Sequence, residues 1–175
     1  MPLPEPRRYA EDKVLGISVR QRRNEKVDDY SALSAMVEVA RERGYAIKVL
    51  VLSNGRTGAA DLKATERLPF HPFEVVHSES MDELTAALGG LDVLASMKFH
   101  GSLVASMYGV PSIVLSPTSK SRNLYRLMGR EQLLSHLNDP RLRFYAKPTS
   151  AGTYRGELPG DTRDQPLNQI SRIGE

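Results

Sequence analysis

The stretch LASMKFHGSLVASMYGVPSIVL, residues 94–115, decides the fold class of this chain. It begins with the end of an apolar run typical of a buried strand, continues into a short helix that ends at Gly109, and closes with a second apolar run. Parallel strands need a connection that crosses the sheet, and a helix usually supplies it. The stretch therefore predicts one strand, helix and strand unit, with Lys98, His100 and Gly101 where the first strand ends.

The same alternation occupies the chain before and after this stretch. We expect strands at residues 14–19, 46–53, 73–77, 91–96 and 111–116. We expect helices from about 28 to 43, from the polar segment that follows 54–58 to about 68, from Ser80 with Glu83 completing a capping box, and at 119–129 and 131–137. NGRTG, residues 54–58, is interpreted as a turn. The pattern predicts the α/β class, a Rossmann-like parallel sheet with helices on both faces.

Length and composition predict one ordered domain with tails. Of 175 residues, 40% are hydrophobic and 26% charged, the balance of a soluble globular protein. We expect a linker-like segment at 1–11, the domain at 12–145, and a flexible or disordered tail at 146–175. The start lacks the apolar core of a signal peptide, and no run approaches the roughly 18 to 20 apolar residues of a membrane-spanning helix. A cytoplasmic location is expected.

Charge and residue content exclude several kinds of site. The net charge is +3, but the basic residues are scattered and aromatic residues make up only 6%, which disfavours nucleic acid and favours an anionic small molecule or a membrane surface. Without cysteine there is no disulfide, thiolate nucleophile or cysteine-ligated metal. His71, His77 and His136 are isolated, and GxSxG, GxGxxG and HExxH motifs are absent, so we expect no metal and no cofactor.

The polar residues after the strand at 91–96 predict an anion site. Ligands of a doubly wound sheet bind at the carboxyl ends of its strands, where helix N-termini present free N–H groups. Lys98 supplies a cation and His100 a proton donor there, while Gly101 and Ser102 supply backbone access and a hydroxyl at the start of the next helix. A basic loop that merely caps a strand explains the same residues, and both interpretations stay open.

Two further cations have the same position relative to a strand. Arg20 follows the first strand and reaches the same anion if the first and fourth strands are neighbours, although a solvated arginine is the simpler interpretation. Lys120 follows the fifth strand and either holds an anionic group or lies in the first turn of an exposed helix. Asp92, within an apolar run, is interpreted as the start of a strand and not as a base.

Residues 91–127 resemble the C-terminal signature of the polysaccharide pyruvyl transferase family. That signature has an Arg-x-His at a strand end, a helix of small residues, Gly-Val-Pro with a strand, and a loop with a lysine. The matching residues are Lys98-Phe99-His100, then GSLVASMYGVPSIVL, then Lys120 with LYRLMG downstream. Lysine replaces the family's arginine at position 98, which keeps the charge but loses a bidentate contact.

The resemblance implies a transferase of exopolysaccharide or cell-surface glycan biosynthesis. It would move the pyruvyl group of phosphoenolpyruvate onto a sugar as a ketal, with His100 as general acid and with Lys98, Arg20, Gly101, Ser102 and Lys120 around the donor. The chain would equal the donor-binding half of a GT-B fold, and a separate acceptor-binding domain would precede residue 1. Phosphoenolpyruvate is then a substrate and no cofactor is implied; contact with the inner face of a membrane fits a lipid-linked acceptor.

Two alternatives stay open. A GT-B-like glycosyltransferase domain would bind a nucleotide sugar and would need a carboxylate for the ribose at this edge; none is clearly placed, and Glu131 is a distant candidate. A non-catalytic binding domain would keep the fold without the acceptor half.

Overall fold

A computed structural model describes residues 13–21 and 29–145 of the chain. Within them five strands form one parallel sheet in the order β3-β2-β1-β4-β5. The strands are β1 (Lys13–Ser18), β2 (Tyr45–Val51), β3 (Glu74–His77), β4 (Val93–Ser96) and β5 (Ser112–Val114). The expected segments at 1–11 and 146–175 lie outside the described residues.

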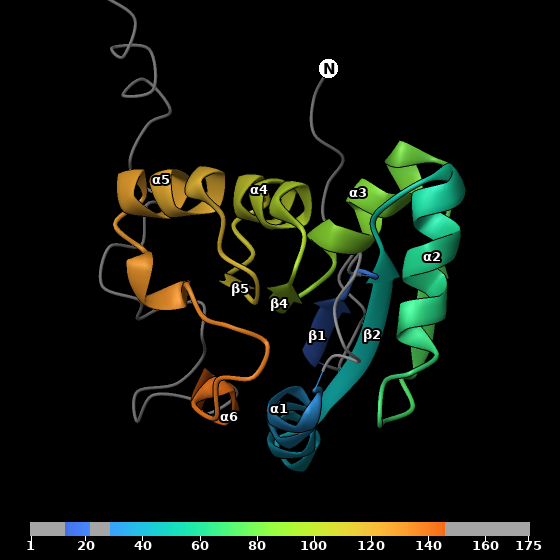
Figure 1. Ribbon diagram of the computed structural model, residues 1–175, viewed down its shortest axis with the longest axis horizontal. Helices are drawn as coiled ribbons and strands as arrows, with labels where there is room; N and C mark the ends of the chain where they lie inside the picture. Colours follow the sequence, from blue (N-terminus) through green and yellow to red (C-terminus); the bar gives the residue numbers. More distant parts are fainter. Residues whose placement is uncertain (1–12, 22–28, 146–175) are drawn as a thin grey trace, which may run out of the picture.

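Helices connect the strands and cover both faces of the sheet. They are α1 (Ser31–Glu42), α2 (Gly55–Thr65), α3 (Met81–Gly89), α4 (Phe99–Met107), α5 (Ser119–Leu127), the 3-10 turn η1 (Glu131–Leu133) and α6 (Leu142–Tyr145). The chain first runs outward from β1 to β3 and then returns to β4 on the other side of β1, so right-handed crossovers place α1 and α3 on opposite faces. Figure 1 shows α1 and α6 on one side of the sheet and α3 and α4 on the other. The predicted Rossmann-like α/β class is confirmed.

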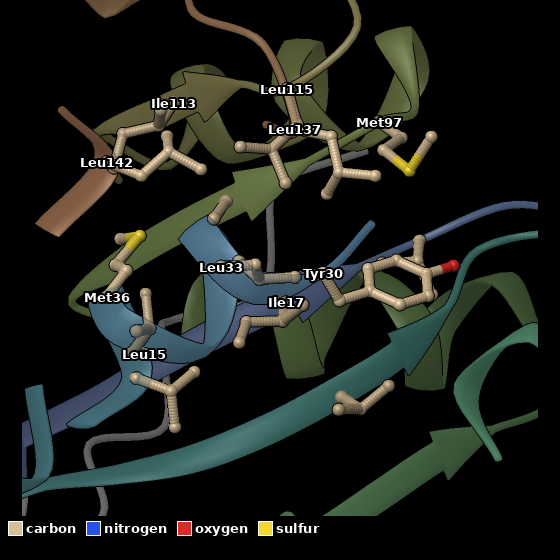
Figure 2. Packing of buried hydrophobic residues seen from close by; sticks show 14 of the residues in the cluster. Leu15, Ile17, Tyr30, Leu33, Met36, Met97, Ile113, Leu115, Leu137 and Leu142 are labelled. Carbon is tan, nitrogen blue, oxygen red and sulfur yellow. The ribbon is translucent and has the colours of Figure 1, made fainter. Parts of the chain in front are cut away.

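Strands β1, β2, β4 and β5 are largely buried on both faces of the sheet, which explains their continuous apolar runs. On the first face, Ile17 of β1 packs in one cluster with Leu33 and Met36 of α1, and Leu142 of α6 joins them (Figure 2). On the second face, Val14 of β1, Leu50 of β2 and Leu94 of β4 pack with Leu88 of α3 and Ala105 of α4. Side chains alternate along each strand, so a single run such as VLGIS supplies both cores.

The expected boundaries differ most at α2 and at η1. NGRTG is not a separate turn: Gly58 N donates to Asn54 O at 3.1 Å, which is helical bonding, so α2 begins at Gly55. The helix expected at 131–137 is only the three residues of η1. Beyond it Ser135 N donates to Val114 O at 2.8 Å, because the chain pairs briefly alongside β5 instead of continuing the helix.

The expected helix starts are confirmed in part. The Ser80 hydroxyl accepts from Glu83 N at 3.4 Å and caps α3. The reciprocal half of the capping box differs, since Ser80 N donates to Ser78 Oγ, and that hydroxyl donates to the Glu83 carboxylate. Asp92, expected to begin a strand at 91–96, lies one residue before β4: its carboxylate accepts from Val14 N at 2.9 Å, which joins the starts of β1 and β4.

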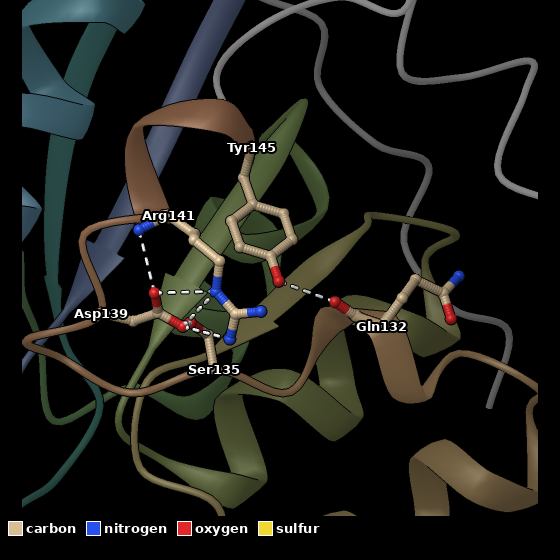
Figure 3. Close-up of polar contacts among 5 residues, drawn as sticks. All are labelled: Gln132, Ser135, Asp139, Arg141 and Tyr145. Atoms are coloured by element: carbon tan, nitrogen blue, oxygen red, sulfur yellow. Dashed lines mark hydrogen bonds and ion pairs between the residues drawn. The ribbon is translucent and has the colours of Figure 1, made fainter.

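Helix α6, which the sequence pattern did not predict, is held by a small polar cluster. The Asp139 carboxylate accepts from the Arg141 guanidinium at 2.8 Å and from Ser135 Oγ at 3.2 Å, and Tyr145 Oη donates to Gln132 O at 2.7 Å (Figure 3). The Arg141 contacts hold the pKa of Asp139 well below its ordinary range. These bonds tie the end of the described chain back to η1.

Candidate anion-binding site

The order in which successive strands join the sheet reverses between β1 and β4, which are parallel, hydrogen-bonded neighbours. Ser18 at the end of β1 pairs with Ser96 at the end of β4, and Met97 N donates to Ser18 O at 2.9 Å. Arg20 and Lys98 each lie two residues beyond a member of that pair, so both stand at the same edge of the sheet. Ligands of doubly wound sheets bind at this kind of switch point. The sequence predicted that Arg20 could reach the same anion as Lys98 only if the first and fourth strands were neighbours. The structure meets this condition.

The Lys98 side chain turns from β4 across β1 toward β2. Its Nζ donates to Ser53 Oγ, just after β2, at 2.6 Å and forms an ion pair with Asp61 Oδ2 of α2 at 2.5 Å. The other oxygen of Asp61 accepts from Gln21 N at 2.8 Å. The Lys98 side chain is 16% exposed and that of Asp61 only 2%, so the pair is largely removed from water. Lys98 stands at the predicted edge, with its charge balanced by Asp61.

Asp61 is the residue of this site that sequence reasoning missed. It lies on the buried face of α2 between Gly58 and Ala64, three residues from each. A Cβ at Gly58 would lie 2.3 Å from the Ser53 carbonyl oxygen, so a glycine there lets α2 approach the end of β2 closely. The sequence did carry a signal for it: Asp61 has helical spacing to two small residues that face the core, Gly58 and Ala64. An acidic residue on such a face is buried, and a buried carboxylate needs a partner.

Arg20 points in the opposite direction, toward β5. Its Nη2 donates to Ser116 Oγ at 3.3 Å, just beyond β5. Its Nε is buried and has no hydrogen-bond partner within residues 13–21 and 29–145. Among the described ion pairs none involves Arg20. Within that part of the chain its guanidinium is thus a cation at the switch point without a balancing carboxylate.

The start of α4 carries the remaining residues of the predicted motif. The helix begins at Phe99, two residues earlier than expected, which makes Lys98 its N-cap and places His100 in its first turn. His100 is exposed, and its ring meets the Phe99 ring edge-on with centroids 5.6 Å apart. Gly101 is buried where a Cβ would lie 2.4 Å from a Leu52 methyl group. The first turn of α4 therefore packs closely against the end of β2 and leaves the imidazole accessible.

Ser102 is fully buried, and its hydroxyl serves packing. It accepts from Ser112 Oγ at 3.0 Å, which joins α4 to β5. Tyr125 Oη of α5 donates to Ser112 O at 2.7 Å, and burial raises the pKa of this phenol. These bonds fix α4 and α5 against β5. Lys120 is exposed in the first turn of α5, behind a complete capping box.

The structure thus gathers Arg20, Lys98 and His100 at one edge and places Ser102 inside the packing. The roles expected of these residues toward a donor stay predictions. Within residues 13–21 and 29–145, no group of three or more histidine and acidic side chains is arranged to hold a metal ion. No helix in the same part of the chain is both long and apolar enough to cross a bilayer.

Comparisons with known proteins add a distant structural likeness. No protein-family model matches the sequence, and no curated protein matches it. A solved structure, described as the glycotransferase of kitacinnamycin, is similar with a TM-score of 0.40 and 15% sequence identity. The match covers 80% of this chain and 38% of that one, so the chain spans well under half of the length of its structural neighbour.

Proposed function

We propose that this chain binds the anionic donor of a transferase at the carboxyl ends of β1 and β4. The donor is phosphoenolpyruvate, and the reaction is pyruvyl transfer to a sugar of an exopolysaccharide or cell-surface glycan. The observation that supports this is the adjacency of β1 and β4, which brings Arg20 and the exposed His100 to one edge from distant parts of the sequence.

The chemistry needs a cation and a proton donor at this edge. The methylene carbon of phosphoenolpyruvate gains a proton, two sugar oxygens form bonds to the adjacent carbon, and the bond from that carbon to the phosphate oxygen breaks. One hydroxyl proton of the sugar replaces the proton that His100 donates, and the other leaves with the phosphate. A guanidinium that binds the phosphate stabilises the negative charge that this group carries away when the carbon–oxygen bond breaks, and one that binds the carboxylate orients the donor.

The rest of the assembly belongs to the same proposal. The chain is then the donor-binding half of a GT-B-like enzyme, and the sugar acceptor binds to a separate domain that faces this edge. An acceptor carried on a lipid places the assembly at the cytoplasmic face of a membrane. Lys120, exposed in the first turn of α5, is a further contact for the donor.

A nucleotide sugar fits this edge less well than phosphoenolpyruvate. Its ribose hydroxyls would need a carboxylate with free acceptor positions. Asp61 lies at this edge, but its side chain is only 2% exposed, and its two oxygens already accept from Gln21 N and from Lys98. Ser53, at the end of β2 where such a ribose would lie, also accepts from Lys98. We therefore keep the nucleotide sugar as the competing ligand in the test.

The test is calorimetric titration of phosphoenolpyruvate into the full chain, with inorganic phosphate, pyruvate and a nucleotide sugar in parallel. Arg20→Gln should weaken phosphoenolpyruvate binding at least about tenfold, because charge-assisted hydrogen bonds contribute about 1.5 to 3 kcal/mol. The matched control is Arg43→Gln. Arg43 is an exposed arginine at the C-cap of α1, and its replacement should leave binding unchanged.

Two results would contradict the proposal. One is phosphoenolpyruvate binding no tighter than inorganic phosphate and pyruvate, and the other is an equal effect of Arg20→Gln and Arg43→Gln. Tight binding of the nucleotide sugar alone would favour the glycosyltransferase alternative. The role of His100 is tested with a sugar acceptor and its domain present: His100→Gln should abolish phosphate release while phosphoenolpyruvate still binds.

A further inference from the structure

We propose that Asp61 determines which cation at the switch point meets the anionic ligand: it neutralises Lys98 and leaves Arg20 to bind. The inference rests on the proposed function for the location of the ligand and adds the charge arrangement within that site. Asp61 then acts as a positioning residue, and the lysine of the Lys98-Phe99-His100 motif is not the donor's main contact.

The first step is the engagement of Lys98. An ammonium has three N–H donors, and two of them are used by Ser53 Oγ and Asp61 Oδ2. Both charged side chains are largely buried, so removing one of them leaves the other as an uncompensated buried charge. A ligand that drew Lys98 away would leave the Asp61 carboxylate, among the described residues, with the hydrogen bond from Gln21 N and no balancing cation. The pair is therefore expected to persist when the anion binds.

The second step links Asp61 to Arg20. The hydrogen bond from Gln21 N to Asp61 Oδ1 fixes the backbone directly after Arg20 at 2.8 Å. From that fixed backbone the Arg20 side chain extends toward Ser116 and β5, away from the Lys98 pair. The Asp61 carboxylate thus neutralises the charge of Lys98 and also fixes the backbone next to Arg20. A single planar guanidinium then selects a carboxylate or phosphate by two parallel N–H bonds, whereas two cations would attract any anion.

The test is titration of inorganic phosphate and of phosphoenolpyruvate into Asp61→Asn, at low and at moderate salt. The asparagine keeps the shape and an acceptor for Gln21 N, and it releases the Lys98 charge. We expect both ligands to bind about fivefold to tenfold tighter than to the unaltered chain, with a steeper loss of affinity as salt rises. Glu42→Gln, which removes an exposed carboxylate at the far end of α1, is the control for net charge and should change neither affinity.

A second variant separates charge from folding. In Asp61→Asn with Lys98→Met both charges are gone, so no buried ion is left without a partner. This double variant should bind both ligands within about twofold of the unaltered chain, and adding Arg20→Gln should remove that binding. Far-ultraviolet circular dichroism and thermal melting establish that each variant is folded. If Asp61→Asn alone does not fold, the double variant still reports whether Lys98 contacts the ligand.

The outcomes separate this inference from the proposed function. A gain of phosphate affinity in Asp61→Asn, without any preference for phosphoenolpyruvate in the unaltered chain, supports the charge arrangement and contradicts pyruvyl transfer. An affinity in Asp61→Asn equal to or below that of Glu42→Gln overturns the inference. So does a tenfold loss in the double variant, because Lys98 would then bind the ligand directly. A purely structural role for Asp61 predicts weaker binding, never tighter.

Discussion

Replacing Gly58 with alanine should destabilise the protein, although alanine is the better helix former. A Cβ at this position would lie 2.3 Å from the Ser53 carbonyl oxygen and 3.0 Å from its carbon. These are backbone atoms at the end of β2, and they cannot rotate away as a side chain could. Helix α2 or the end of β2 must shift to restore ordinary contact.

The magnitude follows from two opposing terms. Alanine gains up to about 1 kcal/mol over glycine inside a helix. Overpacking against a well-packed neighbour costs about 1 to 3 kcal/mol, and a shift of α2 also loosens the Asp61 bonds to Lys98 and Gln21 N, one turn further along. Hydrogen bonds to charged groups contribute about 1.5 to 3 kcal/mol each, so even a partial weakening of the Asp61 bonds lowers the free energy of unfolding measurably. We expect a net loss of about 2 kcal/mol in the free energy of unfolding.

The assay is urea unfolding of the full chain followed by circular dichroism. Thr57→Ala is the matched control, because Thr57 is exposed and immediately precedes Gly58 in α2. It gains helix propensity without a steric overlap, so it should be neutral or stabilising by a few tenths of a kcal/mol. If Gly58→Ala proves as stable as Thr57→Ala, the close approach of α2 to β2 does not hold Asp61 in place, and the reasoning is refuted.

Two further predictions concern pH. Tyr125→Phe should cost about 1 kcal/mol at neutral pH by removing the bond to Ser112 O. The folded-state pKa of Tyr125 is raised, so its stabilisation is complete below pH 10 and is lost as pH rises through that pKa; the phenylalanine variant should show a shallower alkaline loss in urea unfolding between pH 9 and 11.5. Asp139 has a lowered pKa, so its stabilisation is present above the unfolded value near 4 and is lost as pH falls. Asp139→Asn should therefore destabilise most at pH 7 and somewhat less at pH 3, because the stabilisation is lost only gradually below the unfolded value; equal effects at both pH values would contradict the role of its contacts with Arg141.

The residues that the sequence placed at the site are in part those that the structure gathers. Arg20 and Lys98 could be assigned to strand ends because each follows an apolar run, and strand ends are a local property. The partners of these two cations could not be assigned in that way. Asp61 lies 37 residues from Lys98 and Ser116 lies 96 from Arg20, and a long side chain can turn toward either neighbouring strand.

The sequence by itself determined the α/β class and the alternation along the chain of the five strands with the helices between them, because apolar periodicity and helix ends are set by neighbouring residues. Only the tertiary structure decided that β1 lies beside β4, that α2 comes close enough at Gly58 to bury Asp61, and that this carboxylate balances Lys98 while Arg20 turns toward Ser116. The physical reason is that charge balance at a strand end depends on which distant side chains share its buried volume, and packing, not local sequence, sets that distance.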